Sequence, residues 1–129
     1  MSPRTALLAS ALVVAVLVGW LAWPRPAGPR VEQAGTDRHV VRLAAGADRW
    51  TVEVDDRSGA PAAVDEVVLE PVMVDMGHAA EPVTARAGRP GRFDLPAPPL
   101  PMDGQWQVTV RFRDPGGEER AVLPLLHAR

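Results

Sequence analysis

The chain of 129 residues contains no cysteine, lysine, asparagine, isoleucine or tyrosine. The lack of cysteine excludes disulfide bonds, thiolate-bound zinc, iron–sulfur clusters and thiol nucleophiles. The lack of asparagine excludes an Asn-linked glycan. All 14 basic residues are Arg, and against 16 acidic residues they leave a net charge of −2. Because this balance offers no basic surface for a polynucleotide, we do not expect a nucleic-acid partner.

Residue patterns that support catalysis are also scarce. Serine occurs only at Ser2, Ser10 and Ser58, and none of these stands in a nucleophile-elbow context. The three His residues have no Asp or Ser neighbour that would define a catalytic triad. No glycine-rich phosphate loop opens a helix. We therefore expect a protein that is not an enzyme.

The chain has one long apolar run, residues 6–23, which carries no charged side chain. As a helix its 18 residues would span about 27 Å, close to the roughly 30 Å hydrocarbon core of a bilayer. Trp20 and Trp23 stand near its end, where indole rings suit the headgroup level. A cleaved signal peptide is the alternative, but prolines follow the run in place of a small-residue cleavage site. The sequence predicts a short tail at residues 1–5 and a single-pass membrane anchor at residues 6–23.

Residues 24–36 are rich in Pro and Gly and predict a stiff, solvated spacer. A soluble domain at residues 37–129 would follow it. Arg residues flank the apolar run on both sides, so charge does not fix the orientation. The usual topology, with the short tail inside, places the domain on the extracytoplasmic side of the cell membrane.

Within the domain, apolar residues alternate with polar ones at a period of two. The clearest case is Gln105–Arg113, in which every second residue from Trp106 to Phe112 is apolar. Residues Arg49–Val54 follow the same pattern. Further predicted strands are His39–Ala44, Glu66–Val74, Pro82–Ala87, Arg92–Pro96 and Glu119–Leu126. About seven short strands separated by turn signals predict an immunoglobulin-like antiparallel β-sandwich, with a small β-barrel as the alternative.

Methionine and histidine are placed unusually close together near the end of the predicted strand 66–74. In an extended chain Met76 and His78 would project to the same side. Thioether sulfur and neutral imidazole together favour Cu(I) over zinc or magnesium. Met73 is a further candidate ligand, although it shares strand parity with Val67 and Leu69, so packing in the core is its plain alternative.

Two more candidates follow from strand pairing. If the strand ending near Val74 lies antiparallel to the strand beginning near Gln105, Met102 comes to face the turn that holds Met76 and His78. We therefore expect Met102 to be a third ligand, although a methionine that caps the end of a sandwich is also ordinary packing.

The last candidate depends on the register of the final hairpin. A turn at residues 115–117 that pairs Arg113 with Glu118 also places His127 opposite Gly104, at the same end of the sheet. His127 is then a candidate fourth ligand, or else part of a frayed chain end. We do not expect His39, at the start of the first predicted strand, to bind metal.

These residues also carry a family resemblance. The segments Met73-x-x-Met76-Gly77-His78, Gly91-Arg92-Phe93 and Leu100-Pro101-Met102-Asp103-Gly104-Gln105-Trp106 occur in this order. Together they resemble the YtkA-like domain family and the related FixH-type proteins, over about residues 66–113. The resemblance implies a membrane-anchored, outward-facing immunoglobulin-like domain linked to copper handling or to the assembly of copper-containing respiratory complexes. Val74 stands where many members have proline, which weakens Met73 as a ligand.

The sequence thus predicts a Cu(I) site formed by Met76, His78 and Met102, with Met73 and His127 as further candidates. Such a site would serve delivery of copper to a receiving metalloprotein or a membrane complex. The alternative is a metal-free structural or interaction module that docks on a membrane complex through a sheet face or through the proline-rich loop at residues 95–101.

Overall fold

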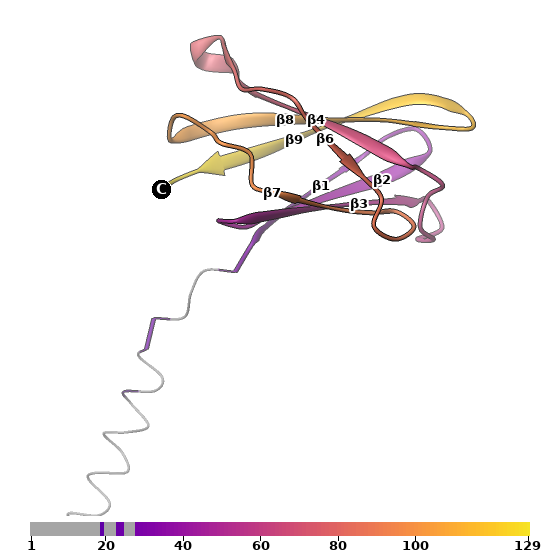
Figure 1. Ribbon diagram of the computed structural model, residues 1–129, viewed down its shortest axis with the longest axis horizontal. Helices are drawn as coiled ribbons and strands as arrows, with labels where there is room; N and C mark the ends of the chain where they lie inside the picture. The colour runs from indigo at the N-terminus through magenta and orange to yellow at the C-terminus, as the bar shows by residue number, and fades with distance from the viewer. Residues whose placement is uncertain (1–18, 20–22, 25–27) are drawn as a thin grey trace, which may run out of the picture.

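The computed structural model describes residue 19, residues 23–24 and residues 28–129. Two antiparallel β-sheets pack face to face (Figure 1). The four-stranded sheet has the order β1-β2-β3-β7, and the five-stranded sheet has the order β5-β4-β8-β9, with β6 also paired to β4. The predicted tail and nearly all of the predicted anchor lie outside the described residues. Among the residues that are described, no helix is long and apolar enough to cross a membrane.

The first sheet comprises β1 (Arg30–Gly35), β2 (His39–Ala45), β3 (Arg49–Asp56) and β7 (Arg92–Pro96). The second comprises β4 (Glu66–Met73), β5 (His78–Ala79), β6 (Val83–Arg86), β8 (Gly104–Asp114) and β9 (Gly117–His127). A short 3-10 helix, η1 (Val74–Met76), links β4 to β5.

One hydrophobic core lies between the sheets, and the predicted alternation accounts for it. Trp106 is fully buried on β8, and Trp50 on β3 is 3% exposed. The remaining core is built largely from branched aliphatic residues at the inward positions of both sheets: Val41, Leu43, Val52, Val54, Val67, Leu69, Val108, Val110 and Leu123. Burial of this apolar surface is the main term that stabilises the domain. The predicted all-β, antiparallel architecture is confirmed.

The hairpin of β8 and β9 has the predicted register. Arg113 pairs with Glu118, and Gly104 pairs with His127. The turn closes at Gly117, whose φ of +126° is a conformation that glycine adopts without a steric penalty. The predicted position of His127 beside the start of β8 is therefore confirmed.

The described residues form nine strands where the sequence predicted about seven, and the largest difference is β1. The predicted spacer at residues 24–36 is wrong over Arg30–Gly35, which pairs with β2 along its whole length. The hydrophobic pattern could not show this strand, because Val31 is 61% exposed and only Ala34 packs against the core. Backbone hydrogen bonds to an already formed sheet hold it instead. The sandwich therefore begins at Arg30 and not at residue 37.

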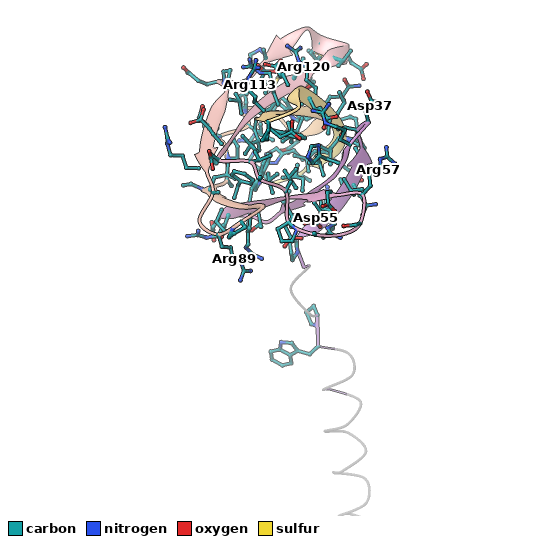
Figure 2. All side chains as sticks on the ribbon, turned by 90° about the vertical axis from the view of Figure 1, so that its right-hand side faces the viewer. Asp37, Asp55, Arg57, Arg89, Arg113 and Arg120 are labelled. Carbon is teal, nitrogen blue, oxygen red and sulfur yellow. The ribbon has the colours of Figure 1, made fainter. Side chains whose placement is uncertain are left out.

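The two ends of the sandwich carry different chemistry. We call the Met/His end the one at which β1, β3 and β8 begin and β2, β4, β7 and β9 end; it lies on the left of Figure 1, where the chain also terminates. We call the opposite end, with the β8–β9 turn, the His39 end. Figure 2 looks at the His39 end, with Arg57, Arg89 and Arg113 pointing outward.

Candidate metal centre and a second cluster

The turn between β4 and β5 fixes the position of His78. Met73 and His78 are direct partners across the two strands. Between them η1 turns the chain, and Gly77 takes a left-handed conformation with φ +60° and ψ +26°. The Gly77 N–H donates a hydrogen bond of 3.1 Å to the Val74 carbonyl. The expected extended chain from Met76 to His78 is therefore wrong, because Gly77 permits a tighter turn than other residues do.

This turn changes which methionine lies beside the imidazole. Cross-strand partners project to the same face of a sheet, so Met73 and His78 both belong to the inner face. Met73 is 5% exposed, as its parity with Val67 and Leu69 predicts, while His78 lies at the exposed rim. Met76 is carried on η1 and is 67% exposed. The structure thus pairs His78 with Met73, and leaves Met76 outside this pair.

Trp106 connects His78 to Met102. The rings of His78 and Trp106 meet edge to face, with centroids 6.3 Å apart and an interplanar angle of 78°. The indole Nε1–H of Trp106 donates a hydrogen bond of 3.1 Å to the Met102 carbonyl. This bond fixes the loop before β8, and the Met102 side chain is half-buried against the core. Met102 therefore lies at the Met/His end, as predicted.

Gly104 brings Met73 and His127 to the same place. A side chain at Gly104 would put its Cβ 3.2 Å from the Met73 methyl carbon, so the absence of a side chain makes room for Met73. Gly104 is the cross-strand partner of His127. The Nε2 atom of His127 is buried and has no hydrogen-bond partner among the described residues, and its nearest carboxylate oxygen, on Asp103, is 3.9 Å away.

Four of the five predicted ligands thus gather around Trp106 and Gly104: Met73, His78, Met102 and His127. In the described part of the chain, no three His, Asp or Glu side chains converge as a metal site. A metal at the Met/His end would therefore depend on thioether sulfur. Thioether sulfur is a soft donor and imidazole nitrogen is a borderline one, and the Nε2 atom of His127 has no hydrogen-bond partner among the residues that the structure describes. This donor set fits Cu(I), which thioethers select over hard divalent ions.

A second cluster lies at the His39 end and was not expected from the sequence. His39 is 4% exposed, its Nδ1 contacts Glu119 Oε2, and its Nε2 lies 3.2 Å from Asp114 Oδ2. Thr36 donates a hydrogen bond of 2.9 Å to Glu119. The imidazole ring also meets Phe112 edge to face at 5.2 Å. These contacts join the turn before β2 to the β8–β9 hairpin, and so link the two sheets.

The electrostatics of this cluster follow from its contacts. Burial raises the pKa of Glu119, but the hydrogen bonds from His39 and Thr36, together with the nearby charges of His39 and Arg38, outweigh it, so the pKa is lowered overall. Burial likewise opposes ionisation of Asp114, but the hydrogen bonds from Arg38 and the Gly116 N–H, together with the nearby charges of Arg38 and His39, outweigh it, so the pKa of Asp114 is lowered. Both carboxylates are therefore held in the charged form, and the contacts that hold them stabilise the fold.

One sequence signal could have revealed this cluster. Glu119 occupies an inward position of β9, in phase with Ala121 and Leu123. A charged residue among inward apolar positions is costly unless it has a buried partner. The hairpin register alone does not identify that partner, because His39 comes from the other sheet.

The comparison with known families agrees with the predicted resemblance to the YtkA-like family. A sequence model of the YtkA-like family matches residues 36–111, from just before β2 to near the end of β8. The match covers more than half of the chain and includes the turn with Met73 and His78. No curated protein and no solved structure matches the chain. The chain belongs to the YtkA-like family.

Proposed function

We propose that the protein is a membrane-anchored, non-enzymatic domain that binds Cu(I) at the Met/His end. His78 and Met102 are the central ligands, a thioether from Met73 or Met76 joins them, and His127 is the fourth donor. The observation that carries the proposal is the pairing of Met73 with His78 and of Gly104 with His127, which brings three donors from distant segments to one inner face. Met102 joins them through the loop that Trp106 holds by its hydrogen bond.

The burial of these residues suits metal transfer. Met73 is buried, whereas His78 lies at the rim, so a metal held between them would be reached from solvent on one side. Because His78 lies at the rim, an incoming donor can approach the metal on that side and replace the imidazole. The domain therefore has the properties of a carrier and not of a permanent structural site.

The apolar run at residues 6–23 anchors the chain in the cell membrane, with the domain on the extracytoplasmic side. The sandwich is of the immunoglobulin-like type, and a single anchor followed by such a domain resembles the FixH-type proteins. Copper would then pass to a respiratory metalloprotein or to a membrane complex that assembles one.

The test is a Cu(I) competition titration of the full chain in detergent against a chromophoric chelator. His78→Ala and Met102→Leu should each weaken Cu(I) binding at least about tenfold, because loss of one ligand removes on the order of 1.4 kcal/mol or more. Glu81→Ala, an exposed residue just after β5, is the matched control and should bind as the unchanged protein does. Equal affinity in all four proteins would overturn the proposal.

A metal-free docking module is the second candidate, and one surface favours it. On the outer face of β9, Val122 is 53% exposed and Leu126 is 52% exposed, with Pro124 between them in the same row. The proline-rich loop does not offer such a patch, because Leu95 and Leu100 are buried in the core. A photo-crosslinking side chain at position 122 should then capture the same membrane protein with and without copper. Capture that depends on copper would argue against this second function.

A further inference from the structure

The chain joins the sandwich at the Met/His end. Arg30 begins β1, and its guanidinium donates a hydrogen bond to the Leu126 carbonyl, next to His127. Gly28 and Arg30 also line the same pocket as Trp50 and His127. Figure 1 shows β1 beginning on the side where β9 ends. The segment that leads toward the apolar run therefore leaves the domain beside the candidate ligands.

The connecting segment is short. Residues 24–29 separate Trp23, the last residue of the apolar run, from Arg30, and three of these six residues are proline. A fully extended chain spans at most about 3.6 Å per residue, so the seven steps from Trp23 to Arg30 cover at most about 25 Å. Arg30 is thus held within about 25 Å of the point where the proposed anchor leaves the bilayer.

The sandwich is longer than this tether. Strands β8 and β9 each have 11 residues, and at about 3.4 Å per residue they extend roughly 35 Å from one end of the domain to the other. For the His39 end to rest on the membrane, Arg30 would have to stand about 35 Å above it. Because the tether is too short for that, an orientation with the His39 end against the bilayer is excluded.

We propose that the Met/His end faces the membrane and exchanges its metal with a membrane-embedded protein that presents soft donor groups at the same surface. This inference rests on the proposed function, since it takes both the anchor and the metal site from it. A short tether keeps the donor residues in a thin layer next to the bilayer, where the effective concentration toward a membrane-bound acceptor reaches the millimolar range. Transfer to an acceptor dissolved in the surrounding water would not be accelerated by this arrangement.

The orientation is tested with the full chain in phosphatidylcholine nanodiscs that contain a gadolinium-chelating headgroup lipid. The chain has no cysteine, so Ala79→Cys on exposed β5 and Arg113→Cys at the His39 end each give a single nitroxide label. Figure 2 shows Arg113 pointing outward at that end. The label at position 79 should relax several-fold faster than the label at position 113. The proposal would be overturned if gadolinium enhanced the relaxation of both labels equally, enhanced that of the label at position 113 more, or enhanced neither.

The partner class is tested by metal transfer. The nanodisc-bound protein, loaded with Cu(I), is mixed with the same chelator either attached to a lipid headgroup or free in solution. Transfer to the attached chelator should be faster at equal bulk concentration. Insertion of ten prolines between Gly28 and Pro29, which adds about 31 Å, should slow that transfer more than tenfold and change transfer to the soluble chelator less than twofold. If the insertion has no effect, or if transfer to the soluble chelator is faster, the acceptor is a soluble molecule and the proposed membrane-embedded partner is wrong.

The two failures can be told apart. A full chain that does not bind Cu(I) in the competition titration contradicts the proposed function and removes the exchange step. The nitroxide measurement needs no metal, so it still decides which end of the sandwich faces the bilayer.

Discussion

Met73 and His78 lie directly opposite each other across β4 and β5, and their side chains leave the sheet on the same face. Met76, only two residues before His78, is separated from that face by the turn at Gly77. Sequence proximity and spatial proximity therefore favour different methionines. This difference leads directly to a test.

Replacing Met73 by Leu should weaken Cu(I) binding at least about fivefold more than replacing Met76 by Leu. Leucine nearly conserves the volume of methionine, so the core should tolerate the change at Met73 with a loss of less than about 1.5 kcal/mol. The measurement is the same competition titration, with urea unfolding to verify that both variants are folded. A larger effect at Met76 would show that the exposed thioether, and not the buried one, completes the site.

Replacing Gly77 by Ala should displace His78 and reduce Cu(I) affinity. The left-handed conformation costs a residue with a side chain about 1 kcal/mol, and no atom lies within 4 Å of the added Cβ. Gly59 offers a matched control, because it also has positive φ, also has open space around it, and lies at the His39 end. Gly59→Ala should lower stability by a similar amount and leave the affinity unchanged. Equal affinity in both variants would mean that the turn does not position the imidazole.

Binding of Cu(I) should quench the fluorescence of Trp106, because the His78 ring lies 6.3 Å from the indole. The quenching should persist in Trp50→Phe, whose indole belongs to the opposite sheet, and disappear in Trp106→Phe. Emission is recorded during titration of the full chain. Quenching that survives in Trp106→Phe would place the metal away from this residue.

Lowering the pH should destabilise the domain through Glu119. Burial opposes ionisation of Glu119 in the folded state, but the hydrogen bonds from His39 and Thr36 and the nearby charges of His39 and Arg38 outweigh burial, so the folded pKa is lowered. A carboxyl group with a lowered folded pKa contributes stability above its unfolded pKa of about 4.3, and this contribution is lost as pH falls through that value to the folded pKa. The urea midpoint should therefore decrease between about pH 5 and pH 3.

Glu119→Gln separates this effect from general acid denaturation. Loss of the charged hydrogen bonds should cost about 2 kcal/mol at pH 7, and the urea midpoint should then depend less on pH between 5 and 3. Glu66→Gln is the control, because Glu66 pairs with Arg86 at the surface and surface ion pairs contribute little. An unchanged acid profile in Glu119→Gln would exclude the cluster as the cause.

The strands that carry the core could be predicted from the sequence. In β8 the alternation of apolar and polar residues determines which side chains face inward, and the turn at Gly117 fixes the register that places His127 opposite Gly104. Met102 could be placed because its loop leads directly into that strand. Local pattern was sufficient wherever one strand face is buried and one is solvated.

The remaining features depend on contacts that leave no local pattern. Strand β1 is held by its backbone pairing with β2, and its sequence does not alternate between apolar and polar residues. The position of His78 depends on a single left-handed residue, which hydrophobic periodicity does not detect. The partners of His39 come from the other sheet, 80 residues away in the case of Glu119. Only the assembled sandwich brings these groups together.

The chain joins the domain at Arg30, and β9 ends beside the pocket that Arg30 and His127 line. A fluorescent protein fused after Arg129 would therefore crowd the surface of the candidate ligands, where the proposed acceptor would dock. Weak copper uptake by such a fusion would reflect obstruction and not chemistry. The exposed turn at residues 88–90, which contains the Arg89 labelled in Figure 2, lies at the His39 end and is the better position for an epitope.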